Sequence, residues 1–302
     1  MTGADSAAAS TLGDFVGAWN FFNPLLVLLA LAVGAYFTGL VRLQRRSGGE
    51  AISRSRIFFA SAGFTMLFLA LVGPFDVYSG DLFFVHMIQH MLLTMAAAPL
   101  LLASSPMPAY MWSLPETVRM GVGSTLSGRG LVRRLIALVT RPMFTLPLYV
   151  LTLWLWHMPA AYSLALENDY VHFLEHASMF GVGVLFWWPI IGPSPVRSSL
   201  SYPQRMIYVM LVVTPMAVLA AFLTLAHDVS YHPYLLTPEH WGISKAEDQG
   251  IAGMIMWIPG NVIFLAAVTV IFFKWFDSEE KKSREQRRAS RRLAPRDDAG
   301  KI

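Results

Sequence analysis

Two pairs of histidines in this sequence have the spacing of metal ligands on helices. His86 and His90 lie four residues apart in an apolar run, and His172 and His176 have the same separation in another. Residues four apart sit on one side of a helix, one turn above the other. A polar group inside a hydrophobic span is costly without a partner, so each pair predicts a bound ligand or a polar neighbour.

Copper is the metal that the accompanying side chains favour. Imidazole suits copper, zinc, iron and nickel, whereas thioether sulfur selects Cu(I), and Met87, Met91 and Met95 recur every four residues beside the first pair. The sequence has no cysteine, which excludes thiolate metal sites and disulfides. Carboxylates would serve to fix the imidazole tautomers. The predicted ligands are His86, His90, His157, His172 and His176, with Met254, Met256, Glu175 and Asp248 as possible assisting residues.

Other interpretations stay open at this stage. A single histidine in a span is more often a helix–helix hydrogen-bond partner than a ligand, and methionine is a common filler of irregular packing. Histidines facing each other from two helices could instead ligate haem in a membrane redox protein. A copper permease is a further alternative, although transport needs polar groups along the whole path. Trp154, Trp156, Trp187 and Trp188 fit interface or packing roles.

The composition places the helices that carry these residues in a membrane. Of 302 residues, 55% are hydrophobic and only 14% are charged, against about 25% charged in a soluble domain. Roughly 20 apolar residues cross the hydrocarbon layer as a helix. We therefore expect an all-α fold, a polytopic membrane helix bundle with seven transmembrane helices at 20–42, 55–74, 82–104, 142–164, 170–192, 203–226 and 249–275.

Outside the bundle, the sequence predicts three less regular segments. Residues 1–19 form an amino-terminal segment that contains no basic residue, so we expect the first span of the 20–275 domain to be retained rather than cleaved as a signal. Proline and glycine interrupt 107–141, whose run LVRRLIALVTR is expected to lie along the membrane surface. The basic tail, 276–302, is expected to be disordered. Prolines such as Pro99 fall inside spans, where neighbouring helices must satisfy the carbonyls that they free.

The positions of the basic residues predict the orientation. All of the 23 lysines and arginines except Lys245 fall on alternate connections or at the carboxyl end. Because cytoplasmic loops carry the excess of basic residues, we expect the amino end outside and the carboxyl end in the cytoplasm. All eight histidines then lie on the outer side, with His227, His232 and His240 at the end of the sixth span and in the loop after it.

Three runs resemble the multi-spanning CtaG family of cytochrome c oxidase assembly factors. They are HMIQHMLLTMAAAPLLLASSP (86–106), WLWHMPAAYSLALENDYVHFLEHASMFGVGVLFWWPIIG (154–192) and DQGIAGMIMWIPG (248–260). The resemblance spans about 75–275 and places the family's motif positions on both histidine pairs and on His157, Asp248 and Gln249.

This resemblance implies a bacterial inner-membrane protein that is needed to form an active haem–copper oxidase and that takes part in copper delivery. Its partners would be cytochrome c oxidase subunits and, through the basic tail, membrane lipid; nothing aromatic accompanies the charge of that tail, so we expect no nucleic acid. The sequence contains neither HExxH nor GxSxG, and HFLEH lacks the glutamate next to the first histidine that zinc proteases use. We therefore expect a protein that is not an enzyme.

Overall fold

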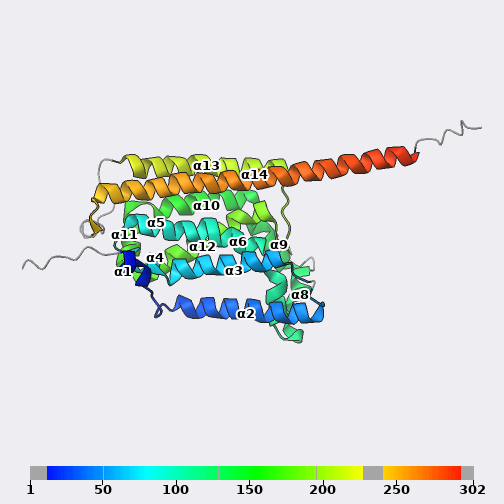
Figure 1. Ribbon diagram of the computed structural model, residues 1–302, viewed down its shortest axis with the longest axis horizontal. Helices are drawn as coiled ribbons and strands as arrows, with labels where there is room; N and C mark the ends of the chain where they lie inside the picture. The colour runs from blue at the N-terminus through cyan, green and yellow to red at the C-terminus, as the bar shows by residue number, and fades with distance from the viewer. Residues whose placement is uncertain (1–11, 50, 128–129, 195, 227–240, 294–302) are drawn as a thin grey trace, which may run out of the picture.

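The computed structural model of this chain is a bundle of helices that run side by side along its longest dimension (Figure 1). It describes residues 12–49, 51–127, 130–194, 196–226 and 241–293, and these ranges contain no strand, as the all-α prediction requires. In chain order the helices are α1 (Leu12–Gly17), α2 (Leu25–Arg46), α3 (Arg54–Leu71), α4 (Pro74–Val77), α5 (Phe83–Met91), the π-helical turn η1 (Leu92–Ala97), α6 (Ala98–Ala103), α7 (Met107–Ser113), α8 (Glu116–Ser127), α9 (Leu131–Val139), α10 (Pro142–Trp156), α11 (Pro159–Glu167), α12 (Asp169–Ile191), α13 (Tyr202–Leu225) and α14 (Lys245–Leu293).

Within the described ranges, six helical stretches are long and apolar enough to cross a membrane. Large apolar side chains such as Leu31, Leu151 and Leu265 are exposed on the outside of the bundle. So much exposed apolar surface is unfavourable in water and is expected of helices in contact with lipid. The chain is therefore a multi-pass membrane protein. The orientation of its ends stays a prediction.

The predicted fourth span, 142–164, is not one helix. Helix α10 ends at Trp156, and α11 begins at Pro159. The residue before a proline avoids the helical conformation, and Met158 is accordingly extended, with φ −71° and ψ 132°. Since α10 is short, a seventh span results only if α10 is joined to α9, from which it is bent by 55°. Helix α9 has no buried residue, and its position on the membrane surface stays a prediction.

The tail that was expected to be disordered is helical as far as Leu293. Helix α14 continues from the bundle without a break and projects beyond the other helices (Figure 1). Its charged side chains support the helix, because residues three or four apart form ion pairs between Lys282 and Glu279 and between Arg284 and Glu280. The prediction of disorder is thus wrong for 276–293, and 294–302 lie outside the described residues.

The stretch Phe83–Ala103, which comprises α5, η1 and α6, lies at the centre of the bundle. It has the largest buried share of the candidate spans, 61%. Leu93 packs into an apolar cluster formed with α2, α3 and α7, whereas Met95 packs into a second cluster formed with α10 to α14. This stretch therefore joins two cores, and it carries the first histidine pair.

A π-helical turn interrupts this central stretch just before Pro99. Because proline has no N–H, it cannot donate to the carbonyl of Thr94, its acceptor in the wider π register. Trp187 of α12 donates its indole N–H to that carbonyl instead, at 2.9 Å. At Pro99 the expectation that a neighbouring helix satisfies the freed carbonyl is therefore confirmed.

Helix α12, which carries the second histidine pair, has well-defined ends. The Asn168 side chain accepts hydrogen bonds from the backbone N–H groups of Tyr170 and Val171, as an N-cap does. At the other end Gly192 adopts a left-handed conformation with φ 64°, which ends the helix without the strain that a Cβ would bring. Between them, Gly183 lets α12 approach η1 closely, since a Cβ there would lie 3.1 Å from the Cα of Thr94.

Candidate metal centre

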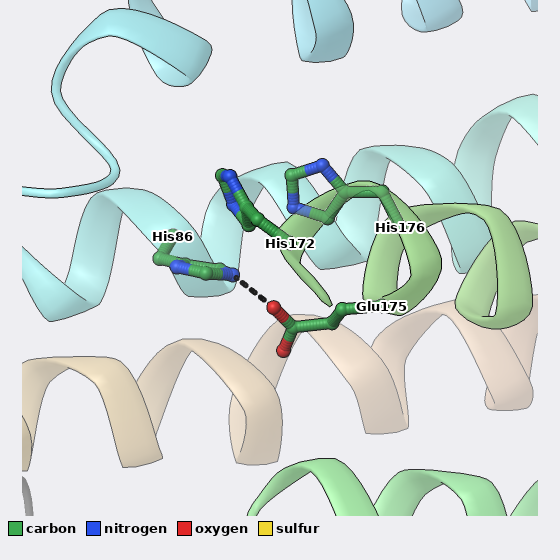
Figure 2. A group of neighbouring side chains, drawn as sticks. All are labelled: His86, His172, Glu175 and His176. Atoms are coloured by element: carbon green, nitrogen blue, oxygen red, sulfur yellow. Dashed lines mark ion pairs between the residues drawn. The ribbon is translucent and has the colours of Figure 1, made fainter. Parts of the chain in front are cut away.

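The two histidine pairs meet inside the bundle. His86 of α5 faces His172, Glu175 and His176 of α12, as Figure 2 shows. Each of these four residues offers one ligand atom, and the four atoms lie within 4.8 Å of one another. His86, Glu175 and His176 are buried, and His172 is partly buried. We call these four residues the histidine cluster.

His90 lies against this cluster as a fifth residue. Its Nε2 is 2.8 Å from Nε2 of His86, so that one of the two nitrogens donates a hydrogen bond to the other. The carboxylate of Glu175 faces both of these nitrogens, with Oε2 at 3.6 Å from His86 Nε2 and Oε1 at 3.5 Å from His90 Nε2. The backbone of Ser79 forms a further hydrogen bond with His86.

Several potential donor atoms of these residues are buried without a hydrogen-bond partner among the residues that the structure describes. They are Nδ1 of His90, Nε2 of His172, Nε2 of His176 and both carboxylate oxygens of Glu175. Buried polar atoms normally have a hydrogen-bond partner. A group of several such atoms without one therefore requires an explanation. A single cation bound between these residues would accept the lone pairs of the nitrogen and oxygen atoms that face one another.

The spacing of the donor atoms is close to that needed for a single ion. Bonds of about 2.1 Å to a tetrahedral ion would place its ligand atoms about 3.4 Å apart. The observed limit of 4.8 Å exceeds this by an amount that small side-chain rotations can close. Three imidazoles and one carboxylate form a donor set that copper, zinc and iron all accept.

Asp248 supports the cluster in a different way from that predicted. Its carboxylate is buried and accepts hydrogen bonds from the backbone N–H groups of Phe83 and Phe84, both at 2.9 Å. The expectation that Asp248 fixes an imidazole tautomer is therefore wrong. It caps α5 because the N–H groups of a helix's first turn have no partner within the helix. Its neighbour Gln249 is also buried and donates to the carbonyl of Leu223.

His157 and the two predicted methionines lie outside the cluster. The ring of His157 is 6.3 Å from that of His90, between centroids, and its Nε2 is 3.3 Å from the sulfur of Met87. Met256 is buried, but the side chain of Met254 is 44% exposed. Residues two apart on a helix point in nearly opposite directions, so Met254 faces away from the core and cannot assist a buried ion.

Sequence reasoning missed the polar contacts that hold Gln89, which lies between His86 and His90 on α5. Gln89 donates to the carbonyl of Ala70 at 2.7 Å and to the carboxylate of Asp76 at 3.2 Å. Asn20 and Asn23 donate to the same carboxylate. Gln89 is visible in the sequence as a polar residue between two histidines, but its partners are not. His227, His232 and His240 lie outside the described residues.

Comparisons with known proteins agree with the family resemblance. The profile described as cytochrome c oxidase caa3 assembly factor (Caa3_CtaG) matches residues 34–278. An uncharacterized protein of Mycobacterium bovis is 26% identical over 288 residues, which cover 92% of this chain and 42% of that protein. One of Mycobacterium leprae is 24% identical over 292 residues, which cover 94% and 43%. The chain thus spans less than half the length of these relatives. No solved structure matches it.

The matched residues include both histidine pairs, His157 and Asp248, and all or part of each of the six candidate spans. It covers most of the chain, from within α2 to the part of α14 that follows the bundle. This chain therefore belongs to the family of cytochrome c oxidase caa3 assembly factors.

Proposed function

We propose that this assembly factor binds copper in the histidine cluster and delivers it to a subunit of a haem–copper oxidase. The observation that carries the proposal is the convergence of four donor atoms within 4.8 Å, from residues on two separate helices. Several of these atoms have no hydrogen-bond partner in the described part of the chain. Copper is the metal that the oxidase itself needs, and it accepts imidazole and carboxylate ligands.

We place the site near the periplasmic face of a bacterial inner membrane. The cluster lies on α5 and the first turns of α12, toward the end of the bundle where α4 and α11 lie (Figure 1). Helices α8 and α9 and the charged extension of α14 lie at the other end. Basic residues favour the cytoplasmic side, so this separation supports a metal site that opens toward the periplasm. Delivery of an ion exchanges one set of coordination bonds for another and changes no covalent bond, in keeping with a role other than catalysis.

The alternative functions find less support in this geometry. Haem requires two axial ligands with room for a macrocycle between them, whereas Glu175 and a third imidazole occupy the space beside His86 and His176. A permease requires polar groups along the whole path, and the cluster lies toward one end of the bundle. Absorption of the purified protein in the haem region, or copper uptake by vesicles that contain it, would favour these alternatives instead.

Metal analysis of the purified full-length protein tests the proposal. We expect about one copper ion bound at the cluster of the wild-type protein, and loss of that ion in His86→Ala and in His172→Ala. Leu174→Ala is the matched control, because Leu174 lies on α12 beside Glu175 but is 56% exposed. This control should bind copper as the wild type does.

A cellular experiment tests delivery. In a strain that lacks the gene for this protein, the copper content of the oxidase should fall. The wild-type gene and Leu174→Ala should restore it, whereas His172→Ala should not. Restoration by His172→Ala, or unchanged copper binding in both histidine variants, would reject the cluster as the copper site.

A further inference from the structure

Beside the histidine cluster lies a small cavity, half of whose lining residues are methionines. Its volume is about 10 Å³, enough for a single ion and far too small for an organic cofactor. Among the described residues, five methionines from four helices line it: Met87, Met91, Met179, Met216 and Met256. Four of the five are buried, and Met91 is partly buried. We call this site the methionine pocket.

His157 presents a nitrogen to this pocket. Its Nδ1 is 2.7 Å from the carbonyl oxygen of Leu153, which can only accept, so Nδ1 carries a proton and donates it. In the neutral ring Nε2 then has a lone pair and no proton. That nitrogen lies 3.3 Å from the sulfur of Met87. Two lone-pair donors thus meet across a short distance in an apolar cavity, an arrangement that a bound cation would stabilise.

Packing alone does not account well for this arrangement. Methionine often fills irregular space in a core, where any apolar side chain of similar size would serve. Here methionines from α5, α12, α13 and α14 line one void, together with an imidazole that a backbone hydrogen bond orients, and the sulfur of Met87 lies against that imidazole. Hydrogen bonding of the second ring nitrogen to a carbonyl is the arrangement found in histidines that ligate metals.

We propose that the methionine pocket is a second metal site, specific for Cu(I), and that His90 connects it to the histidine cluster. Thioether sulfur selects Cu(I) over the other biological metals, whereas the cluster offers only nitrogen and oxygen. His90 lines the pocket, while its Nε2 is 2.8 Å from His86 in the cluster. Its Nδ1 is buried without a hydrogen-bond partner within the described ranges. One imidazole therefore borders both sites.

The ion would pass between the two sites as Cu(I), so transfer requires neither an oxidant nor a reductant. The transfer step rests on the proposed function of the histidine cluster, whereas the second site stands on its own residues. The two sites can therefore be tested separately.

Anaerobic titration of the full-length protein with Cu(I), against a chromophoric Cu(I) chelator, measures the number of bound ions. X-ray absorption of the loaded protein reports whether sulfur ligates copper. The pocket variant is Met87→Leu with Met256→Leu, since leucine keeps the apolar volume and removes the sulfur. Met254→Leu is the matched control, because it lies on the same helix with its side chain exposed. Thermal unfolding of each variant checks that the bundle remains folded.

We expect two Cu(I) ions in the wild type, one of them ligated by sulfur. The pocket variant should lose one ion and the sulfur signal, and Met254→Leu should keep both. His172→Ala should lose the other ion and retain the sulfur-ligated one. Absence of sulfur ligation in the wild type, or a pocket variant that keeps both ions with an undiminished sulfur signal, would overturn the second site. If His172→Ala keeps both ions while the pocket variant loses one, the pocket is supported and the cluster is rejected as the copper site.

Discussion

The carboxylate of Asp248 accepts a hydrogen bond from the backbone N–H of Phe83 at 2.9 Å, although 165 positions separate the two residues in the chain. Asp248 is near the start of α14, and Phe83 is the first residue of α5. The contact therefore joins the last long helix to the central one, one turn before His86. A negative group at this position also favours the helix, because the amino end of a helix carries partial positive charge.

Replacing Asp248 should weaken both the bundle and the histidine cluster. Asp248→Ala removes the carboxylate that caps α5 and accepts from the N–H groups of Phe83 and Phe84, so we expect a loss of about 2–4 kcal/mol in the free energy of unfolding. Asp248→Asn retains one acceptor oxygen and should lose less. Copper affinity should fall in the same order, because α5 is no longer fixed. Thermal unfolding in detergent and copper titration measure the two effects.

Glu247→Ala is the control for this prediction. Glu247 is the preceding residue of α14, and it is exposed and accepts hydrogen bonds only from Ser244 in the described structure. Its loss should leave the copper affinity unchanged. If Asp248→Ala has the unfolding temperature and the copper affinity of the wild type, the contact with Phe83 does not position the cluster.

The histidine pairs of the cluster could be predicted from spacing and cost. Two histidines four apart share a helix face, and burial in an apolar span demands a partner, so each pair predicted a ligand or a polar neighbour. That the two pairs meet does not follow from spacing, which says nothing about how the helices pack. The role of Asp248 could not be predicted, because its partners are backbone groups on a helix distant in the chain. The difference between Met254 and Met256 depends on which face of α14 meets its neighbours, and spacing within one helix does not reveal that.

The fold, too, could be predicted in part from the sequence. Apolar length predicted the spans that coincide with α2, α3, α12 and α13 to within a few residues. Hydrophobicity gave the wrong result in two places. At Pro159 the apolar run is continuous although the helix is interrupted, and in the tail low hydrophobicity suggested disorder. There the strong helix formers and the pairs such as Lys282 with Glu279 favour a helix that needs no core.

Trp187→Phe should destabilise the central stretch. The substitution keeps an aromatic ring and removes the N–H that pairs with the carbonyl of Thr94, which Pro99 leaves without a donor. An unpaired buried carbonyl costs about 1–3 kcal/mol, so the unfolding temperature should fall. Trp154→Phe, at a tryptophan that is 40% exposed, should unfold as the wild type does. Equal unfolding of the two variants would show that the Trp187 bond contributes no net stability.

Gly183→Val should separate α12 from η1. A Cβ at this position meets the backbone of Thr94 at 3.1 Å, and backbone cannot move aside as a flexible side chain can. Overpacking of this kind costs about 1–3 kcal/mol, and the displaced α12 should also carry His172 and His176 away from His86. We therefore expect lower stability and lower copper affinity together.

Gly181→Val provides a matched control for this steric effect. Gly181 lies on the same helix two residues earlier, and a Cβ there would meet nothing within 4 Å. The two variants introduce the same β-branched residue into the same helix, so any difference between them reports the contact with η1. A copper affinity of Gly183→Val equal to that of Gly181→Val would contradict the prediction.

Glu175→Gln should change metal binding and stability in opposite directions. Glu175 is buried beside three imidazoles, and neither of its oxygens has a hydrogen-bond partner in the described part of the chain. Without metal, the free energy of unfolding should stay unchanged or rise, because glutamine has nearly the same shape and carries no charge for burial to penalise. Copper affinity should fall about 10–100-fold, the range seen when groups that support a metal site are removed.

Copper affinity that falls while stability is kept or raised distinguishes a metal-binding role of Glu175 from a structural one. A residue that only holds the fold would lose stability on substitution, and its loss of affinity would follow from that. Glu167→Gln, at the exposed end of α11, controls for the change of charge and should alter neither quantity. The measurements are copper titration and thermal unfolding with and without bound metal. If Glu175→Gln unfolds more easily and binds copper normally, Glu175 braces the helices, and only the imidazoles remain as ligands.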